Sequence, residues 1–267
     1  MYQQAMPSDP PEPPVSVFAR HVEVLAVIAD ALTPPRFAQL LAQTGLSKGT
    51  LHRILGALQA TGMAVQDPVS QGWKPGLRLI GFASRAWSGL DLRRAAEDET
   101  AALRDATRET IRLSVLQGTE ILYLDQRDSP EPVSLRLGVG ARGPAYCSGT
   151  GKAILAFLKP ERLAAILDAI TLERHTPLTI TDRAALEADL AATRARGYAL
   201  DRGEQAAEVR SLGVPVLNTA GEPVAAISVT VPVFRRSEAE LVALAPLAQQ
   251  AAARIALRLP PGLPAAG

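Results

Sequence analysis

Residues 33–62 carry the pattern that most constrains this chain: two short amphipathic segments separated by a tight turn. Pro34 suits a first helical position, and Thr33 before it can cap that helix with its hydroxyl. Gly45 supplies the left-handed residue that a helix end favours, and Ser47 can cap the second helix. Apolar residues recur with helical spacing in both segments: Phe37, Leu40 and Leu41 in the first, and Leu51, Ile54, Leu55 and Leu58 in the second. This pattern is typical of a helix-turn-helix.

The outward face of the second helix carries small, polar or cationic residues. They are Lys48, Gly49, Thr50, His52 and Arg53. Such residues can approach phosphates and base edges when the helix lies in the DNA major groove. We therefore predict that they contact double-stranded DNA, together with Ser47 at the start of the helix. Two amphipathic helices joined by a glycine turn also occur in proteins that bind no nucleic acid, so the motif alone leaves that alternative open.

The segment after this helix favours DNA binding. A short strand over residues 63–65 and a return strand starting at Trp73 and Lys74 enclose a turn-rich stretch, which predicts a hairpin wing with Lys74 among the DNA contacts. Residues 20–88 hold seven Lys and Arg against three acidic residues, a net charge of +4, whereas the whole chain has a net charge of +1. This local excess suits a dimer that neutralises a few phosphates in each half-site.

Composition excludes several other classes of protein. The chain has 267 residues, long enough for two domains, and its 47% hydrophobic and 21% charged residues indicate a soluble globular protein. No apolar run approaches the roughly 18–20 residues that span a bilayer, so no membrane contact is expected. Residues 1–16 contain five prolines and lack the pattern of a secretory signal, so we expect a disordered arm. The single cysteine fits a reducing cytoplasm.

No metal or other cofactor is expected. Three histidines (His21, His52 and His175) and the cysteine, Cys147, are too widely scattered for a metal site of the usual spacing. Residues 138–143 match G-x-G-x-x-G, but a proline follows where a dinucleotide-binding site needs a helix, so that match is weak. The Gly-Lys pair at 151–152 lacks the Ser or Thr that a P-loop requires.

The remaining segments predict the domain organisation. Residues 17–76 form the DNA-binding domain, whose first helix (17–32) packs through Phe18, Val22, Leu25, Ile28 and Ala29. Residues 77–109 read as a linker helix, whose stripe of Leu77, Ile80, Ser84 and Trp87 suits a dimer contact or packing within the chain. Residues 110–259 mix strands and helices without strict alternation, which predicts an α+β domain over a mostly antiparallel sheet. Residues 260–267 are expected to fray as a tail.

Within this second domain we expect strands near 111–117, 120–127, 133–139, 198–201, 209–217 and 224–233, and a last helix from Ser237 through Leu257. A glycine-rich turn at 148–151 leads into a helix over 151–158, where free backbone N–H groups favour a carboxylate or phosphate. Ser228 and Thr230 are two apart on a strand, so their hydroxyls share one face. Taken singly, each hydroxyl is better explained as a strand residue bonded to its neighbours.

Four longer motifs together resemble the isocitrate-lyase-regulator (IclR) family of transcription regulators. They are GLSKGTLHRIL (45–55), GARGPAYCSGTGKAILAFL (140–158), GYALDRGE (197–204) and VRSLGVPVLNTAGEPVAAISV (209–229), and the resemblance covers residues 17–258. It implies a winged helix-turn-helix, a linker helix and a C-terminal GAF-like domain that binds a small effector. It also implies a homodimer or tetramer that binds a palindromic operator as a repressor or activator.

The resemblance further implies which residues bind the effector. Gly149 and Thr150 fall on the family's backbone site, Asp201 on its acidic residue, Ser211 on a position often occupied by Cys, and Ser228 and Thr230 on its paired hydroxyls. A small carboxylic acid that controls a catabolic operon is therefore expected. The residues Arg142 and Pro144–Cys147, with Arg210 and Ser211, are similar to members that sense aromatic acids such as protocatechuate or 4-hydroxybenzoate, whereas Gly143 and Lys152 depart from them.

Two alternatives involve Cys147. It could act as the nucleophile of an enzyme, with His175 as its base, but His175 has no obvious orienting partner in the sequence. It could also act as a redox switch, although a lone cysteine more often simply packs. We therefore expect a regulator and not an enzyme.

Overall fold

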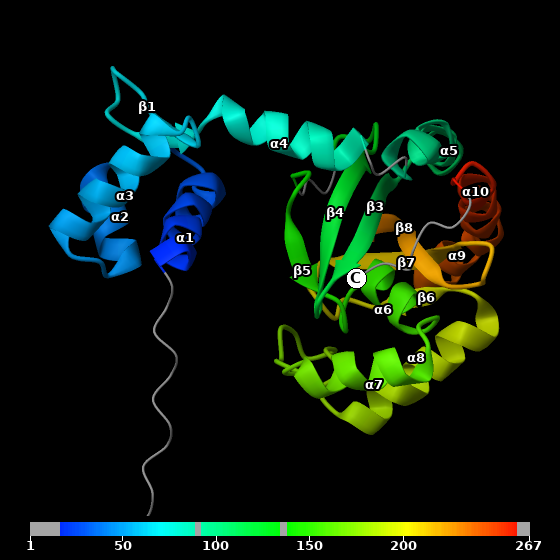
Figure 1. Cartoon of the computed structure of the whole chain (residues 1–267). Coiled ribbons are helices and arrows are strands. Elements are labelled where there is room, and N and C mark those ends of the chain that lie inside the picture. Colours follow the sequence, from blue (N-terminus) through cyan, green and yellow to red (C-terminus); the bar gives the residue numbers. More distant parts are fainter. Residues whose placement is uncertain (1–16, 89–91, 134–137, 261–267) are drawn as a thin grey trace, which may run out of the picture. The chain divides into compact units, whose positions relative to one another are not determined.

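A computed structural model describes residues 17–88, 92–133 and 138–260 (Figure 1). These residues form two compact units, of which the first ends with helix α4 and the second begins with helix α5. The predicted arm over residues 1–16 lies outside the described residues, as does the predicted tail beyond residue 260. In the described part of the chain, no helix is long and apolar enough to cross a membrane.

The first unit contains a helix-turn-helix followed by a hairpin. Its elements are α1 (Val17–Asp30), α2 (Phe37–Thr44), α3 (Lys48–Ala60), β1 (Ala64–Gln66), β2 (Trp73–Pro75) and α4 (Leu77–Ser88). Strands β1 and β2 pair antiparallel, as the sequence predicted for the wing. The unit has one apolar core, to which α3 contributes its whole predicted stripe. Gly45 ends α2 in the left-handed conformation with φ of 62°, and the Ser47 side chain caps α3, both as predicted.

Two predictions for this unit were wrong in detail. Helix α2 is capped at Arg36 and not at Thr33, because the paired prolines at 34 and 35 disfavour helical backbone before Arg36. The Pro35 carbonyl instead accepts a hydrogen bond from the Trp73 N–H, at 2.9 Å, which ties this extended stretch to the wing. In α1, Phe18 and Val22 of the predicted face are exposed, and Val24 enters the core beside Ile28.

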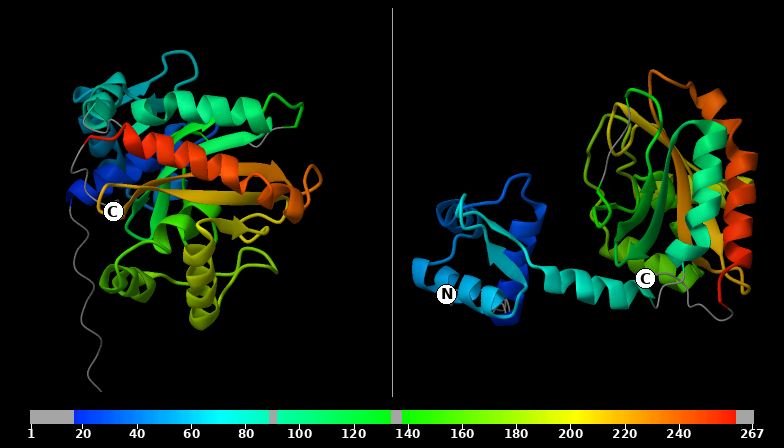
Figure 2. Two further views of the ribbon diagram at one scale, coloured as in Figure 1. Left: turned by 90° about the vertical axis from the view of Figure 1, so that its right-hand side faces the viewer. Right: turned by 90° about the horizontal axis from the view of Figure 1, so that it is seen from above.

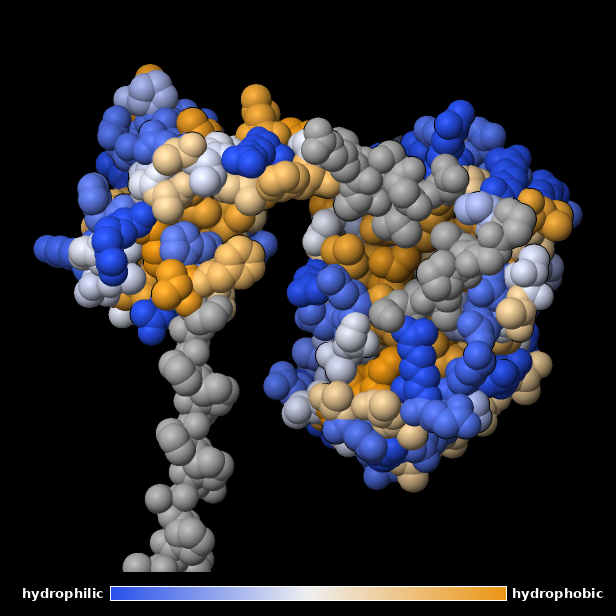
Figure 3. Space-filling model, viewed as in Figure 1, coloured by the Kyte–Doolittle hydropathy of each residue, from blue (hydrophilic) through white to orange (hydrophobic). Residues whose placement is uncertain are grey.

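The predicted linker over residues 77–109 contains α4 and α5 (Leu92–Thr107), while residues 89–91 lie outside the described part. On α4, Leu77 and Ile80 of the predicted stripe are largely exposed, and Figure 3 shows apolar side chains over the first half of this helix. Helix α5 instead buries apolar residues in the core of the second unit.

The second unit is built on one antiparallel sheet of six strands in the order β5-β4-β3-β8-β7-β6. The strands are β3 (Thr110–Gln117), β4 (Glu120–Arg127), β5 (Arg142–Pro144), β6 (Ala199–Asp201), β7 (Val209–Leu217) and β8 (Pro223–Pro232). The helices are α6 (Gly149–Leu155), α7 (Pro160–Ala169), α8 (Arg183–Arg196), α9 (Glu238–Val242) and α10 (Ala245–Leu257). Figure 2 shows α5 and α10 together on one side of the sheet. Helices α6, α7 and α8 share a second core with the other side. The predicted α+β class is therefore confirmed.

Boundaries differ from prediction at two places, and one further expected strand cannot be compared. The expected strand over 133–139 falls largely on residues 134–137, outside the described part. Helix α6 begins at Gly149, because the Ser148 hydroxyl caps it by accepting from the Gly151 N–H. The helix ends at Leu155, before the predicted end at residue 158. The last predicted helix is two helices, since a proline in the first turn of α10 starts a new helix there.

The seat of α6 on the sheet depends on two glycines. A Cβ atom on Gly213 of β7 would lie 2.1 Å from the carbonyl oxygen of Gly149, and one on Gly149 would lie 2.5 Å from the hydroxyl oxygen of Ser211. No side chain fits between the two backbones. The start of α6 is thereby held directly against β7.

Gly213→Ala tests this contact. Because the added methyl group meets backbone, we expect it to destabilise the second unit by about 1–3 kcal/mol. Both tryptophans, Trp73 and Trp87, belong to the first unit, so far-UV circular dichroism in urea should show the loss while tryptophan fluorescence does not. Gly138→Ala is the control, because nothing lies within 4 Å of its added Cβ. Equal stability of both variants would contradict the predicted close contact.

Candidate functional site

The first candidate site is the outer face of α3. Lys48, Gly49, His52 and Arg53 are exposed there, while the four apolar residues of the helix face the core. The Thr50 hydroxyl is bonded to Ser47, with 2.9 Å between the two oxygens, so both residues support the start of the helix. The unit thus presents a cationic helix face on a firmly packed support, which is the arrangement required to enter a major groove.

Lys74 has a different environment from the α3 cations. Its ammonium group pairs with the Asp67 carboxylate at 2.5 Å, across the wing. The hydrogen bond from Lys74 makes the largest contribution to the lowered pKa of Asp67, and hydrogen bonds from Ser70 and Val69 lower that pKa further. Lys74 therefore fixes the wing turn, and a contact of Lys74 with DNA stays a prediction.

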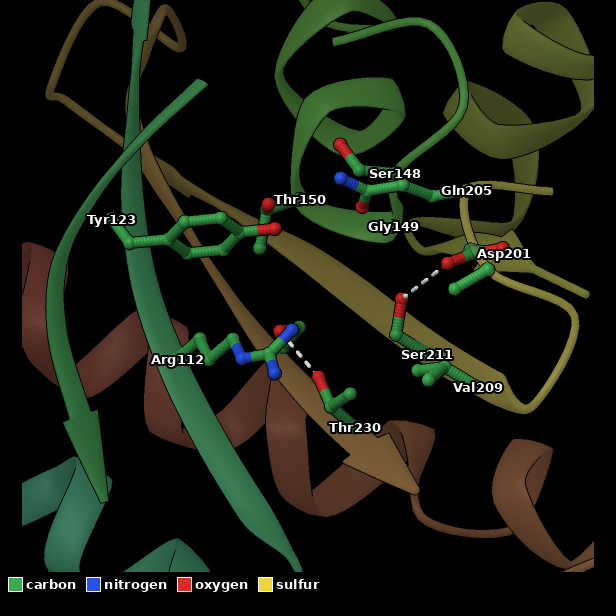
Figure 4. Close-up of a pocket in the computed structure, with 12 residues that line it drawn as sticks. Arg112, Tyr123, Ser148, Gly149, Thr150, Asp201, Gln205, Val209, Ser211 and Thr230 are labelled. Atoms are coloured by element: carbon green, nitrogen blue, oxygen red, sulfur yellow. Dashed lines mark hydrogen bonds between the residues drawn. The ribbon is translucent and has the colours of Figure 1, made fainter. Parts of the chain in front are cut away.

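The second candidate site is a cavity of about 340 Å³ between α6 and the sheet of the second unit (Figure 4). All six residues that the sequence predicted for effector binding line it: Gly149, Thr150, Asp201, Ser211, Ser228 and Thr230. The remaining lining residues are Arg112, Tyr123, Ser148, Gln205, Ala206 and Val209. The fold brings together segments separated by up to 118 residues in the sequence, from Arg112 to Thr230.

Strand register explains how the polar side chains meet. Arg112 on β3 lies opposite Ser228 on β8, and Thr230 lies opposite Ser211 on β7, which lies opposite Asp201 on β6. Paired residues share a face of the sheet, so these five side chains all face the α6 side. The residues between them along each strand enter the apolar core on the other side.

Asp201 both shapes the cavity and lines it. Its Oδ1 atom accepts the backbone N–H groups of Glu204 at 2.7 Å and Gly203 at 3.0 Å, which fixes the loop after β6. Its Oδ2 atom lies 3.4 Å from the Ser211 hydroxyl oxygen. Burial raises the pKa of Asp201, and the two backbone hydrogen bonds oppose that rise.

A buried ion cluster also supports the loop that follows β6. Lys152 of α6 is fully buried, and its Nζ atom lies 2.6 Å from Oε1 of Glu204 and 2.9 Å from Oδ2 of Asp189 on α8. Burial raises the pKa of Glu204 to about 7, against the opposing effect of Lys152. The hydroxyl of Thr179 also donates to the Glu204 carbonyl, at 2.6 Å. The loop that carries Gln205 and Ala206 is therefore held by charge as well as by hydrogen bonds.

No hydrogen bond joins Cys147 to His175, the two described residues proposed for the alternative enzymatic function. Cys147 is fully buried, and burial raises the pKa of its thiol to about 12. A thiol of this kind is a poor nucleophile and is slow to oxidise. His175 instead contacts the Tyr146 hydroxyl, with 3.0 Å between Nε2 and the oxygen. Among the described residues, no group of three or more His, Cys, Asp or Glu side chains could hold a metal ion.

Sequence reasoning missed Arg112 and Tyr123. Arg112 is only 7% exposed, its guanidinium carbon lies 5.3 Å from the centre of the Tyr123 ring, and its Nε donates to the Gln126 amide oxygen at 3.0 Å. The alternation of Thr110, Arg112 and Ser114 with apolar residues was the available signal. A strand with polar residues on a buried face marks a lined cavity or a buried polar network.

A winged helix-turn-helix with a cationic reading face, joined to a sheet domain with a cavity lined by buried polar side chains, defines a DNA-binding transcriptional regulator. Comparison with known proteins agrees. The family model described as bacterial transcriptional regulator IclR C-terminal matches residues 84–257, and that of the IclR helix-turn-helix domain matches residues 18–68. The chain therefore belongs to the IclR family of transcriptional regulators.

Individual relatives give the same result. The HTH-type transcriptional regulator BhcR of Paracoccus denitrificans is 35% identical, over 91% of this chain and 86% of that protein. The transcriptional repressor IclR of Escherichia coli is 28% identical, over 91% of this chain and 89% of that protein. A crystal structure of an IclR homolog of Microbacterium hydrocarbonoxydans complexed with 4-hydroxybenzoate has a TM-score of 0.77 and 28% identity, covering 91% of this chain and 98% of that one.

The exposed cations of α3 provide one test. Arg53→Ala and Lys48→Ala should each weaken binding to an operator fragment, selected from random DNA with the wild-type protein, by about tenfold, and a lost phosphate contact should reduce the salt slope by about 1. Arg20→Ala makes the same charge change on the exposed part of α1 and is the control. Gel shifts over a salt series measure this. Binding unchanged from wild type in both α3 variants would remove these residues from the interface.

The pKa of Glu204 provides a second test. The pKa of Glu204 is about 7 in the folded state, against an ordinary value of 4.5. Because the folded state binds this proton more tightly, the resulting stabilisation is fully present only below pH 4.5 and is lost as the pH rises through 7. Relative to Glu204→Gln, the wild type should lose at most about 3 kcal/mol of unfolding free energy over that rise. Urea unfolding at several pH values measures the difference. A difference that does not change with pH would show that Glu204 ionises normally.

Proposed function

We propose that the cavity beneath α6 binds a small organic acid and that its occupancy changes how the α3 helices of a homo-oligomer bind an operator. The observation that carries this proposal is the row of buried polar side chains that crosses the sheet from Arg112 to Asp201 and lines a cavity of about 340 Å³. Buried polar groups that line a cavity in place of apolar packing orient a ligand. The regulated genes are proposed to form a catabolic operon.

The size and charge of the cavity support an acid of low molecular weight. A volume of about 340 Å³ lies at the lower end for small-molecule sites. Arg112 supplies a full positive charge that is withdrawn from solvent, where an anion interacts with it more strongly than in water. The relative complexed with 4-hydroxybenzoate supports an aromatic acid as one member of this class.

The DNA contacts and the oligomer are part of the same proposal. A palindromic operator requires two reading helices at a fixed spacing, so we propose at least a homodimer. The exposed apolar side chains of α4, Leu77, Ile80 and Phe82, support a contact between copies along this helix. A ligand in the second unit then acts on DNA binding only if it binds the competent and incompetent arrangements with different affinities.

Filling the cavity tests the proposal. Ala206 lines the cavity, whereas its neighbour Ala207 is exposed and does not line it. Ala206→Phe should leave operator binding within about twofold of wild type and abolish its response to acids, because the ring takes the place of the ligand. Fluorescence anisotropy of an operator fragment, titrated with a library of small aromatic and aliphatic acids, measures the response.

Ala207→Phe is the matched control and should respond like the wild type. The proposal predicts that at least one acid in the library changes operator affinity for the wild type and for Ala207→Phe, but not for Ala206→Phe. An acid that acts equally on all three proteins would place the effector site outside this cavity.

A further inference from the structure

Arg36 connects the outer face of α3 to the wing. It directly precedes α2, its side chain is exposed, and its Nε atom donates to the carbonyl oxygen of Ser70 in the wing at 3.0 Å. The next residue, Phe37, lies edge-on against His52 on the outer face of α3, with 6.3 Å between the ring centroids. Arg36 therefore lies between the face of α3 that reads DNA and the hairpin beside it.

The segment before α2 is fixed against the wing through its backbone. The Pro35 carbonyl accepts the Trp73 N–H at 2.9 Å, and a Cβ atom on Gly72 would lie 2.5 Å from the Pro34 carbonyl oxygen. Arg36 thus starts from a fixed backbone position, and its hydrogen bond to the wing fixes the far end of its side chain. A side chain held in this way loses less conformational entropy when it binds a ligand.

The wing hairpin brings no net charge of its own to DNA. Residues 64–75 contain one acidic residue, Asp67, and one cationic residue, Lys74, and these two pair with each other. The other Asp67 oxygen accepts the backbone N–H groups of Ser70 at 2.9 Å and Val69 at 3.1 Å. Because both carboxylate oxygens are engaged within the hairpin, Asp67 binds Lys74 and leaves Arg36 alone.

The guanidinium of Arg36 keeps most of its donors for another partner. Its Nε carries one of the five N–H groups, and the other four lie on the two Nη atoms. In the described part of the chain, no carboxylate forms an ion pair with Arg36. An exposed guanidinium fork with free Nη groups matches the oxygens of a phosphate.

We propose that Arg36 binds a backbone phosphate of the operator, at the edge of the major groove that α3 enters and beside the wing. The hairpin then contributes shape at this place, and Arg36 contributes the charge. A phosphate contact fixes the position of α3 along the duplex and carries no sequence information itself. This inference rests on the DNA-binding role of the first unit and is independent of any ligand in the second.

Arg36→Gln tests the contact, because a glutamine amide can still donate to the Ser70 carbonyl but has no charge. Fluorescence anisotropy should compare the selected operator fragment with a scrambled one over a salt series. The variant should bind both fragments about tenfold more weakly at about 0.1 M salt, with a salt slope reduced by about 0.9 for each half-site. Arg36→Lys keeps the charge and should retain the wild-type slope.

Two controls separate a phosphate contact from other effects of the substitution. Arg20→Gln makes the same charge change on the exposed part of α1 and should leave the slope unchanged. The double variant Asp67→Asn, Lys74→Gln removes the ion pair of the wing without changing the net charge. It should loosen the wing and weaken binding, again with the wild-type slope. Tryptophan fluorescence in urea should show the same stability of the first unit in Arg36→Gln and the wild type.

Three results would overturn the proposal. A wild-type slope in Arg36→Gln, with or without weaker binding, would show that Arg36 only supports the wing. The same loss of slope in Arg20→Gln would show a general effect of charge and no particular contact. A slope that falls as far in Arg36→Lys as in Arg36→Gln would show that the hydrogen bond to Ser70, and not the charge, is what DNA binding requires.

Discussion

The contact between Gly149 and Gly213 is the constraint on which the second unit depends. It places the first turn of α6 against β7, beside the edge strand β6, with no side chain between the two backbones. The same face then exposes the hydroxyls of β7 and β8 to a cavity instead of to an apolar core. A larger side chain at either glycine would push α6 away from β7. The lining residues of α6 would then move away from those of the sheet.

Buried charge is the second element of this design. Lys152 pairs with Glu204, and burial raises the pKa of both the Glu204 and the Asp201 carboxyl groups. The cluster secures the loop after β6, and that loop in turn closes one end of the cavity through Gln205 and Ala206. A polar side chain can orient a ligand only if its own position is fixed by supporting contacts, and this network supplies such contacts. Burial of these charged groups costs stability, and in return the shape of the cavity is fixed.

Local patterns predicted much of the molecule. The caps at Gly45 and Ser47, the stripe of α3, the wing and the shared face of Ser228 and Thr230 all follow from residues close in sequence. The Thr33 cap failed because two prolines impose extended backbone locally. Arg112 was missed although its strand alternates polar with apolar residues, because only the pairing with β8, more than 100 residues away, shows that this polar face is buried. The Lys152–Glu204 pair, 52 residues apart, was missed for the same reason.

The central claim is that a small acid occupies the cavity between Arg112 and Asp201. A crystal structure of the full chain with 4-hydroxybenzoate tests it most directly, because electron density locates the ligand without reference to any variant. Density for the ring is expected in the cavity beneath α6, between Arg112 and Asp201. A ring bound elsewhere in the chain, with the cavity holding only water, would contradict the account.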